Sequence, residues 1–278
     1  MKRIAAITMV RNDSFFLHKW INYYGSKLGK ENLFIYFDGL DQKIPYFCEG
    51  TNCKKVEKIG TSVVASDKGR IKFLSLKATE LFKSGYDMVI GGDADEYLVV
   101  DPLINPSLTD FLSNLKIKTC ASGLGLDFGQ LIGREKDLSL EFPFLNQRHF
   151  AQIGTRYTKV SVLNEPVKWG SGFHRVKGKN FHIIKGLYLM HFGYSDLQII
   201  ENRLNDEDRI NQGWSRHMNK RKRVIKFVNF LPIRNFETMV KLASRIEQIV
   251  RPPYAWNKPG LLGLRIIIEI PQRFYNIL

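Results

Sequence analysis

The stretch GGDADEYL, residues Gly91 to Leu98, puts three carboxylates directly after the apolar run Tyr86–Ile90. The run predicts a buried strand, and an unpaired charge buried at its end would cost several kcal/mol. Two glycines precede the first aspartate and let another group approach the backbone closely. We therefore expect a cation beside these carboxylates: a lysine, a helix end, or a metal ion that carries a substrate.

Around this stretch, the first half of the chain alternates strand-like and helix-like segments. This pattern predicts an α/β fold with a mostly parallel sheet flanked by helices. Sheets of this kind bind nucleotides at the carboxyl ends of their strands. The expected elements are strands at Arg3–Val10, Asn32–Phe37, Lys54–Ile59 and Tyr86–Gly91, and helices at Ser14–Leu28 and Gly69–Phe82.

After Pro102 the expected elements are shorter. Ser195 and Gln198 form a capping-box pattern, which predicts the start of a helix. The other expected elements are a helix at Leu108–Leu115, strands at Thr119–Phe128, Thr158–Leu163 and Asn180–His191, and amphipathic helices at Trp214–Phe230 and Phe236–Ile249. We expect one α/β domain over residues 1–212 and a basic, α-helical C-terminal extension over residues 213–278.

Composition limits the cellular setting. At 278 residues and 44% hydrophobic composition, the chain can bury a full core. No stretch approaches the roughly 20 apolar residues of a spanning helix. The N-terminal run has no small-residue cleavage site, so we interpret it as a first strand rather than a signal peptide. Three cysteines, Cys48, Cys53 and Cys120, fit neither a disulfide framework nor a metal-binding pair. We therefore expect a cytoplasmic protein.

The positive charge is concentrated near the C-terminus. The whole chain has a net charge of +15, and Arg216–Leu278 carries 13 Lys or Arg against three Glu, a net of +10. Basic and apolar residues together in helical segments can lie on an anionic membrane surface. One alternative is that these helices pack on the preceding domain or on a second subunit, with their charges solvated. Another is a nucleic-acid contact, but the front half has no nucleic-acid recognition motif. We expect peripheral attachment to the inner face of the cytoplasmic membrane.

Asp93 and Asp95 form a D-x-D pair. In an extended segment their side chains share one face, and Glu96 points to the other. Such a pair can hold a hard divalent cation and leave positions for phosphate oxygens; the alternative is a salt-bridged strand terminus. A second acidic pair, Asp206 and Asp208, lies in an expected helix, where these positions do not share a face. We interpret that second pair as a solvated acidic turn.

Four ordered motifs, within about Arg3 to Asn202, resemble nucleotide-sugar glycosyltransferases of the GT-A type, and more narrowly the family 2-like and family 92 groups. They are MVRND at Met9–Asp13, L-x-x-W-I-x-Y-Y at Leu17–Tyr24, NLFIYFDG at Asn32–Gly39, and GGDADEYL. The chain departs from the group's pattern at Asp13, Tyr24 and Tyr97, where Glu, His and Phe are usual. By this resemblance, residues 1–212 would form a GT-A catalytic domain.

The resemblance also implies roles for individual residues. Asp93 and Asp95 would bind Mn²⁺ or Mg²⁺ and, through it, the donor diphosphate, with His191 as a third metal ligand. Val10, Arg11 and Asn12 would lie near the base and ribose.

Four further residues are implied with alternatives. Asp38 would bond the base or ribose, unless it only forms an Asp-Gly turn. Lys68 and Arg70 would meet the diphosphate from the start of the Gly69–Phe82 helix, where cations are otherwise disfavoured, or else be solvated. His174 would contact the acceptor or a phosphate.

Sugar transfer with inversion needs a general base, and Asp127 is our candidate, with Glu141 and Glu165 as competitors. The expected activity is metal-dependent sugar transfer from a nucleotide-sugar donor, with UDP preferred, to a saccharide or lipid-linked saccharide of the cell envelope. Two alternatives remain open: a metal-dependent nucleotidyltransferase and a non-enzymatic, basic nucleic-acid-binding protein.

Overall fold

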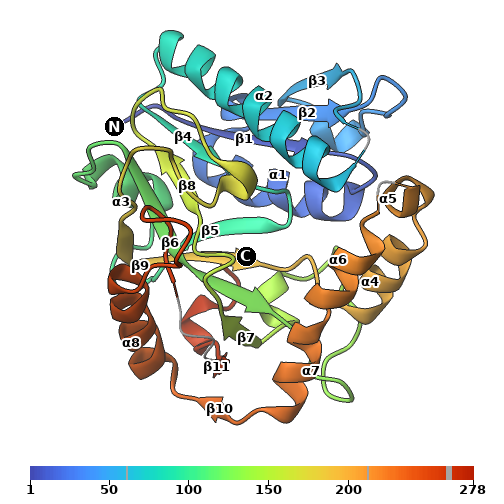
Figure 1. Cartoon of the computed structure of the whole chain (residues 1–278), viewed down its shortest axis with the longest axis vertical. Helices are drawn as coiled ribbons and strands as arrows, with labels where there is room; N and C mark the ends of the chain where they lie inside the picture. The colour runs from blue at the N-terminus through green and yellow to red at the C-terminus, as the bar shows by residue number, and fades with distance from the viewer. Residues whose placement is uncertain (61, 212, 261–264) are drawn as a thin grey trace.

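The computed structural model describes residues 1–60, 62–211, 213–260 and 265–278. Within them, eleven strands form one sheet, in the order β10-β11-β7-β6-β8-β4-β1-β2-β3, with β9 pairing to both β5 and β6 (Figure 1). The strands are β1 Ile4–Val10, β2 Leu33–Asp38, β3 Asn52–Val56, β4 Met88–Gly91, β5 Glu96–Val100, β6 Cys120–Phe128, β7 Phe150–Ile153, β8 Val160–Leu163, β9 Ile183–His191, β10 Ile233–Arg234 and β11 Ile266–Glu269.

The N-terminal part of the sheet is parallel. Strands β4, β1, β2 and β3 all run in one direction, as the alternating sequence pattern predicts. Strands β5, β7 and β8 pair antiparallel with their neighbours. The carboxyl ends of β1, β2 and β4 therefore meet at one edge.

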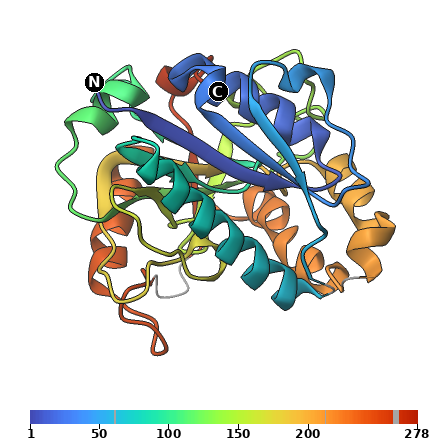
Figure 2. The same ribbon diagram turned by 90° about the horizontal axis from the view of Figure 1, so that it is seen from above.

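Helices cover both faces of the parallel strands. Helix α1 packs on β1 and β2, and α2 packs on β1 and β4, from opposite sides of the sheet (Figure 2). The α/β class is therefore confirmed. The helices are α1 Ser14–Leu28, α2 Val63–Lys83, α3 Leu108–Asn114, α4 Leu197–Leu204, α5 Glu207–Asn211, α6 Ser215–Arg221, α7 Arg223–Phe230 and α8 Phe236–Ile249.

Two tyrosines of α1 fix the middle of β5. Tyr24, at 2% exposure, accepts a hydrogen bond from Leu98 N at 2.8 Å, and Tyr23 donates to Leu98 O at 2.8 Å. The Tyr24 ring also stacks on Tyr97 at 6.4 Å. Both polar groups of a buried residue are satisfied in this way. Tyr24 thus has a core role next to the acidic turn.

Helix α2 begins earlier than predicted. Ser62 caps it by accepting from Ala65 N, so Lys68 and Arg70 lie in its second turn rather than at its start. Gly69 is tolerated inside the helix because Ile59 packs against it; an added Cβ would lie 2.4 Å from Ile59 Cγ2. The prediction that Lys68 and Arg70 lie at the start of the helix is therefore wrong. Both residues still line the cavity described below.

Two other helix boundaries differ from the prediction. Asp196, not Ser195, caps α4 by accepting from Ile199 N at 2.9 Å. Its other carboxylate oxygen pairs with the buried Arg148 at 2.8 Å, an interaction that Ser195 could not make. The helix expected over residues 214–230 is divided into α6 and α7 at Lys222, whose ψ of −9° departs from the α-helical value.

The expected α-helical C-terminal extension is not confirmed. Strand β11 joins the sheet between β7 and β10, and Ile267 and Ile268 are fully buried there. Phe236 of α8 packs on the rings of Tyr188 and Phe274. These apolar side chains bury their surface in the main core, so the C-terminal segment shares the core of the preceding residues. The predicted boundary at residue 212 lies outside the described residues.

A buried carboxylate in α8 makes stability depend on pH. Glu247 is fully buried, and within the described residues neither carboxylate oxygen makes a hydrogen bond. Burial raises the pKa of Glu247 from 4.5 to about 7. Because the folded pKa lies above the unfolded one, the contribution of Glu247 to stability is most favourable below pH 4.5 and falls as the pH rises to about 7.

We expect Glu247→Gln to remove this pH dependence. Relative to the variant, the wild-type protein should lose about 2.5 kcal/mol of unfolding free energy between pH 5 and pH 8. Urea unfolding at both pH values measures the difference, with the exposed Glu201→Gln as control. If the difference between wild type and Glu247→Gln is the same at pH 5 and pH 8, Glu247 does not titrate as described.

Within the described ranges, no helix has both the length and the apolar composition needed to cross a membrane.

Candidate active site

A cavity of about 610 Å³ opens where the carboxyl ends of β1, β2 and β4 meet α2 and helices α4 to α6. Its size suits a small-molecule ligand. It is lined by all the cofactor-binding and metal-ligating residues predicted from the sequence: Val10, Arg11, Asn12, Asp38, Lys68, Arg70, Asp93, Asp95, His174 and His191. Asp127 is absent from the lining.

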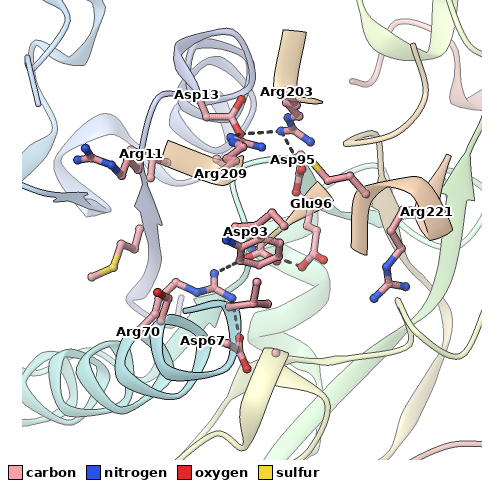
Figure 3. Close-up of a pocket in the computed structure, with 18 of the residues that line it drawn as sticks. Arg11, Asp13, Asp67, Arg70, Asp93, Asp95, Glu96, Arg203, Arg209 and Arg221 are labelled. Atoms are coloured by element: carbon pink, nitrogen blue, oxygen red, sulfur yellow. Dashed lines mark hydrogen bonds and ion pairs between the residues drawn. The ribbon is translucent and has the colours of Figure 1, made fainter. Parts of the chain in front are cut away.

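The acidic cluster, defined as Asp93, Asp95 and Glu96, covers the turn after β4 and the first residue of β5 (Figure 3). One carboxylate oxygen from each residue lies within 4.8 Å of the others. Glu96 N donates to Asp93 O at 3.0 Å and closes the turn. The expectation that Glu96 faces away is wrong, because side chains alternate only in an extended segment.

Two cations balance one half of the acidic cluster. Lys159 Nζ lies 2.5 Å from Glu96 Oε1 and 3.3 Å from Asp93 Oδ2, and Arg70 pairs with Asp93 from α2. The Lys159 and Glu96 side chains are only 7% and 1% exposed. Burial alone would raise the pKa of Asp93, but the charges of Arg70 and Lys159 outweigh it and hold that pKa below its usual range. The sequence predicted a cation beside the carboxylates at this strand end, and Lys159 is one such cation.

Asp95 is held separately, on the other side of the acidic cluster. Arg203 Nη2 lies 3.1 Å from Asp95 Oδ2 and 2.6 Å from Asp13 Oδ2. His191 Nε2 lies 3.8 Å from Asp95 Oδ1. Figure 3 shows Arg203 joined to both aspartates. Asp95 therefore has one guanidinium partner and one imidazole neighbour.

Asp127 orients His191. His191 Nδ1 lies 2.7 Å from Asp127 Oδ1, and since a carboxylate only accepts, Nδ1 carries the hydrogen. The Tyr157 ring stacks on the imidazole at 3.8 Å. Burial lowers the pKa of His191, although Asp127 opposes this, which favours a neutral ring with its Nε2 lone pair on the Asp95 side. This geometry favours Asp127 as a positioning residue rather than a general base.

The donor set beside Asp95 fits a divalent cation. An added Cβ on Gly193 would lie 2.2 Å from Asp95 Oδ2, 2.8 Å from His191 Nε2 and 2.9 Å from Arg203 Nη1. Glycine is thus required for these three groups to converge. Carboxylate oxygens with a neutral imidazole suit Mn²⁺ or Mg²⁺, and a histidine held by a carboxylate is the usual form of a metal-ligating histidine.

Arg11 organises the opposite side of the cavity. Its guanidinium donates to Asp41 at 3.0 and 2.9 Å, to Asp208 at 2.6 Å and to Asp38 O at 2.7 Å. Asp38 in turn accepts from Ile59 N at 2.6 Å. These bonds fix the ends of β1 and β2 against α5.

Asn12 and the second acidic pair complete this side. Asn12 adopts a φ of 50°, a left-handed conformation that asparagine tolerates better than most residues. Its side-chain amide donates to Asp206 and Asp208, each at 3.3 Å. Asp208 also pairs with Lys58 at 2.7 Å. The interpretation of Asp206 and Asp208 as a solvated turn is therefore wrong.

The remaining predicted residues differ in their surroundings. Lys68 is exposed at the rim of the cavity. Burial, then the charges of Lys159 and its neighbours, lower the pKa of His174 to about 2, so its ring is neutral. Its Nδ1 has no hydrogen-bond partner among the described residues. The competing bases Glu141 and Glu165 do not line the cavity.

Sequence reasoning missed several basic residues of the site. Lys159 and Arg203 stand alone in apolar or helical segments, with no motif to single them out. Arg156 and Arg221 also line the cavity, and the Arg221 guanidinium lies 5.8 Å from the Tyr157 ring centre. Figure 3 shows Arg11 and Arg221 on opposite sides of the acidic cluster. Part of the basic C-terminal segment is thus directed into the cavity.

No family model matches the chain, and no curated protein matches it. Two solved structures are similar to it at a low level. One is described as a mannose-1-phosphate geranyltransferase from Thermus thermophilus, at 9% identity and a TM-score of 0.30, covering 96% of this chain and 74% of that one. The other is the galactosyltransferase LgtC with donor and acceptor sugar analogues, at 11% identity and a TM-score of 0.25, covering 96% and 86%. Similarity this low carries no argument about function.

Proposed function

We propose that the chain is a GT-A-type glycosyltransferase that moves a sugar from a nucleotide-sugar donor, with UDP preferred, to a saccharide acceptor of the cell envelope. One observation carries the proposal. A D-x-D pair at the carboxyl end of a central parallel strand faces a carboxylate-held histidine, in the same cavity as the ends of two neighbouring strands. This grouping supports the proposal because it would place a bound cation beside the space proposed for the nucleotide.

The proposed donor lies across the cavity from β2 to the acidic cluster. Val10, Arg11, Asn12 and Asp38 would surround the base and ribose. The bonds that Arg11 makes to β2 and α5 would keep this end rigid before the donor binds, which reduces the ordering cost of binding.

The diphosphate is proposed to lie between α2 and the acidic cluster. Lys68 and Arg70 would approach it from α2. Asp95 and His191 would hold a divalent cation there, with Asp93 completing the D-x-D pair. Such a cation, when bound, neutralises the negative charge that builds on a departing diphosphate.

The acceptor is proposed to enter beside His174, Arg156 and Arg221. His174 offers a neutral imidazole to a hydroxyl or phosphate oxygen. Arg156 and Arg221 give this side a positive charge, which would suit an acceptor that carries phosphate, such as a lipid-linked saccharide. We further propose that the enzyme reaches such an acceptor while attached to an anionic membrane surface.

A nucleotide panel tests the donor proposal. A ligand at 100 times its Kd stabilises the folded state by about 2.7 kcal/mol, so millimolar UDP with Mn²⁺ should raise the melting temperature clearly. We expect UDP to raise the melting temperature more than the other nucleoside diphosphates. Without an acceptor, the protein should hydrolyse UDP-sugars slowly and release UDP. If only nucleoside triphosphates bind and pyrophosphate is released, the protein is a nucleotidyltransferase. If no nucleotide binds and nucleic acid does, the enzymatic proposal is wrong.

A further inference from the structure

The loop that follows α8 projects from the body of the molecule. Residues 250–260, called here the aromatic loop, extend away from the sheet and helices in Figure 2. The loop is closed at its base, where Gly260 N donates to Val250 O at 3.0 Å, and it turns through a bond from Ala255 N to Pro252 O at 3.1 Å. Pro252 and Pro253 restrict the backbone further. The projection is therefore a built feature of the chain.

The aromatic loop exposes large side chains. Tyr254 is 74% exposed and Trp256 is 87% exposed, and Ile249, just before the loop, is 80% exposed. Trp20 and Trp169, by contrast, are almost fully buried. Tryptophan and tyrosine combine an apolar ring with a polar group, and they are enriched at membrane–water interfaces for that reason.

The surroundings of the aromatic loop are basic. No Asp or Glu occurs from Ile249 to Gly260, whereas Arg251 and Lys258 do. Asn257 ties the loop to a second segment by donating to Val176 O at 2.5 Å. That segment, residues 166–195, also contains no Asp or Glu.

The second segment adds further positive charge beside the aromatic loop. Its Lys177 and Lys179 are exposed, and Lys179 has one acidic partner, Glu165, at 3.3 Å. The aromatic loop and the segment it is bonded to are therefore rich in Lys and Arg, and Lys258 lies 5.4 Å from the Tyr254 ring centre. This charge complements an anionic lipid surface.

The aromatic loop also lies close to the candidate active site. Val176, the partner of Asn257, is two residues from His174, which lines the cavity. The charge of Lys258 acts on His174 strongly enough to help lower its pKa. A surface that held the loop would therefore also lie near the acceptor side of the cavity.

We propose that the aromatic loop inserts Trp256 and Tyr254 into the headgroup region of an anionic bilayer and thereby holds the cavity next to a lipid-linked acceptor. The choice of acceptor rests on the proposed function; the membrane contact does not. The occupant is a lipid surface rather than a second protein copy because the loop that carries the exposed rings, and the segment bonded to it, contain Lys and Arg but no Asp or Glu. Burial of the two rings among the lipid headgroups and attraction of Lys and Arg to anionic lipids would both favour this contact.

Vesicle sedimentation tests the inference on the full chain. The vesicles contain either phosphatidylglycerol with phosphatidylcholine or phosphatidylcholine alone. The variant is Tyr254→Ala with Trp256→Ala, and Tyr46→Ala, with a tyrosine 90% exposed at another site, is the matched control. We expect the double variant to bind anionic vesicles about tenfold more weakly. Wild type and Tyr46→Ala should bind alike and lose affinity as salt rises.

Tryptophan fluorescence gives a second readout. Insertion should shift the wild-type emission to shorter wavelength on anionic vesicles, and Trp256→Phe should lose that shift while still binding. The inference is overturned if the double variant sediments like wild type, if neutral vesicles bind as well, or if the wild type does not bind vesicles. It is also overturned if the wild type is a dimer that the double variant dissociates, because the loop would then contact a second copy.

Binding of UDP with Mn²⁺ is measured on the same proteins. The double variant should bind the nucleotide like wild type, since neither residue lines the cavity. Vesicle binding without nucleotide binding would refute the proposed function and keep the membrane contact. Nucleotide binding without vesicle binding would refute the membrane contact and keep the proposed function.

Discussion

Asp95→Asn is expected to lower kcat/KM for sugar transfer at least about 100-fold, in the range seen when one electrostatic stabiliser of a transition state is removed. Asp95 is the carboxylate on the Nε2 side of His191, at 3.8 Å, and it pairs with Arg203 beside Gly193. The substitution keeps the shape of the side chain and removes its charge. Arg203 retains Asp13 as a partner at 2.6 Å, so the fold should survive.

The effect of Asp95→Asn should be specific to the cation. The Mn²⁺ concentration that gives half-maximal activity should rise together with the loss of rate. Asp110→Asn, in α3 and outside the cavity, is the control and should behave like wild type. If the Mn²⁺ dependence of Asp95→Asn is unchanged, Asp95 does not bind a metal ion. Its role would then be to pair with Arg203.

Lys159→Met should be among the most destabilising single substitutions in the chain. Lys159 neutralises Glu96, whose side chain is 1% exposed, at 2.5 Å. Removing one member of a buried ion pair typically costs about 3–5 kcal/mol, because the other charge is left in a medium that does not solvate it. Urea unfolding at pH 8 measures the loss.

A second substitution separates the charge effect from simple packing. The double variant Lys159→Met with Glu96→Gln should regain most of the lost stability, since no unpaired glutamate remains. Lys68→Met, at an exposed position, should change stability by no more than about 0.5 kcal/mol. If Lys159→Met costs under about 1 kcal/mol, or the double variant is no more stable than the single, the ion pair does not hold the acidic turn.

Local sequence patterns predicted the elements that position the site. Apolar runs and helical spacing located β1, α1, β2 and β4, because each signal lies within one segment. They also placed Asp93 and Asp95 at the end of β4. Parallel pairing then brought Val10 and Asp38 to the same edge.

Long-range pairing could not be predicted in this way. Lys159 is 63 residues from Glu96 in the chain, and Arg203 is 108 residues from Asp95; neither has a local signal. Strand β11 was missed because its apolar run follows a proline break and reads equally well as an exposed tail. The alternation rule failed for Glu96 because the backbone turns there.

Calorimetric titration of UDP tests the central claim most directly. The proteins are wild type and Asp95→Asn, each with Mn²⁺ and with a chelator. We predict that wild type binds UDP with Mn²⁺ at least about tenfold more tightly than either wild type with chelator or Asp95→Asn with Mn²⁺, in line with the cost of disturbing a metal site. Equal affinity in all three conditions, or no UDP binding at millimolar concentration with Mn²⁺ present, would contradict the account.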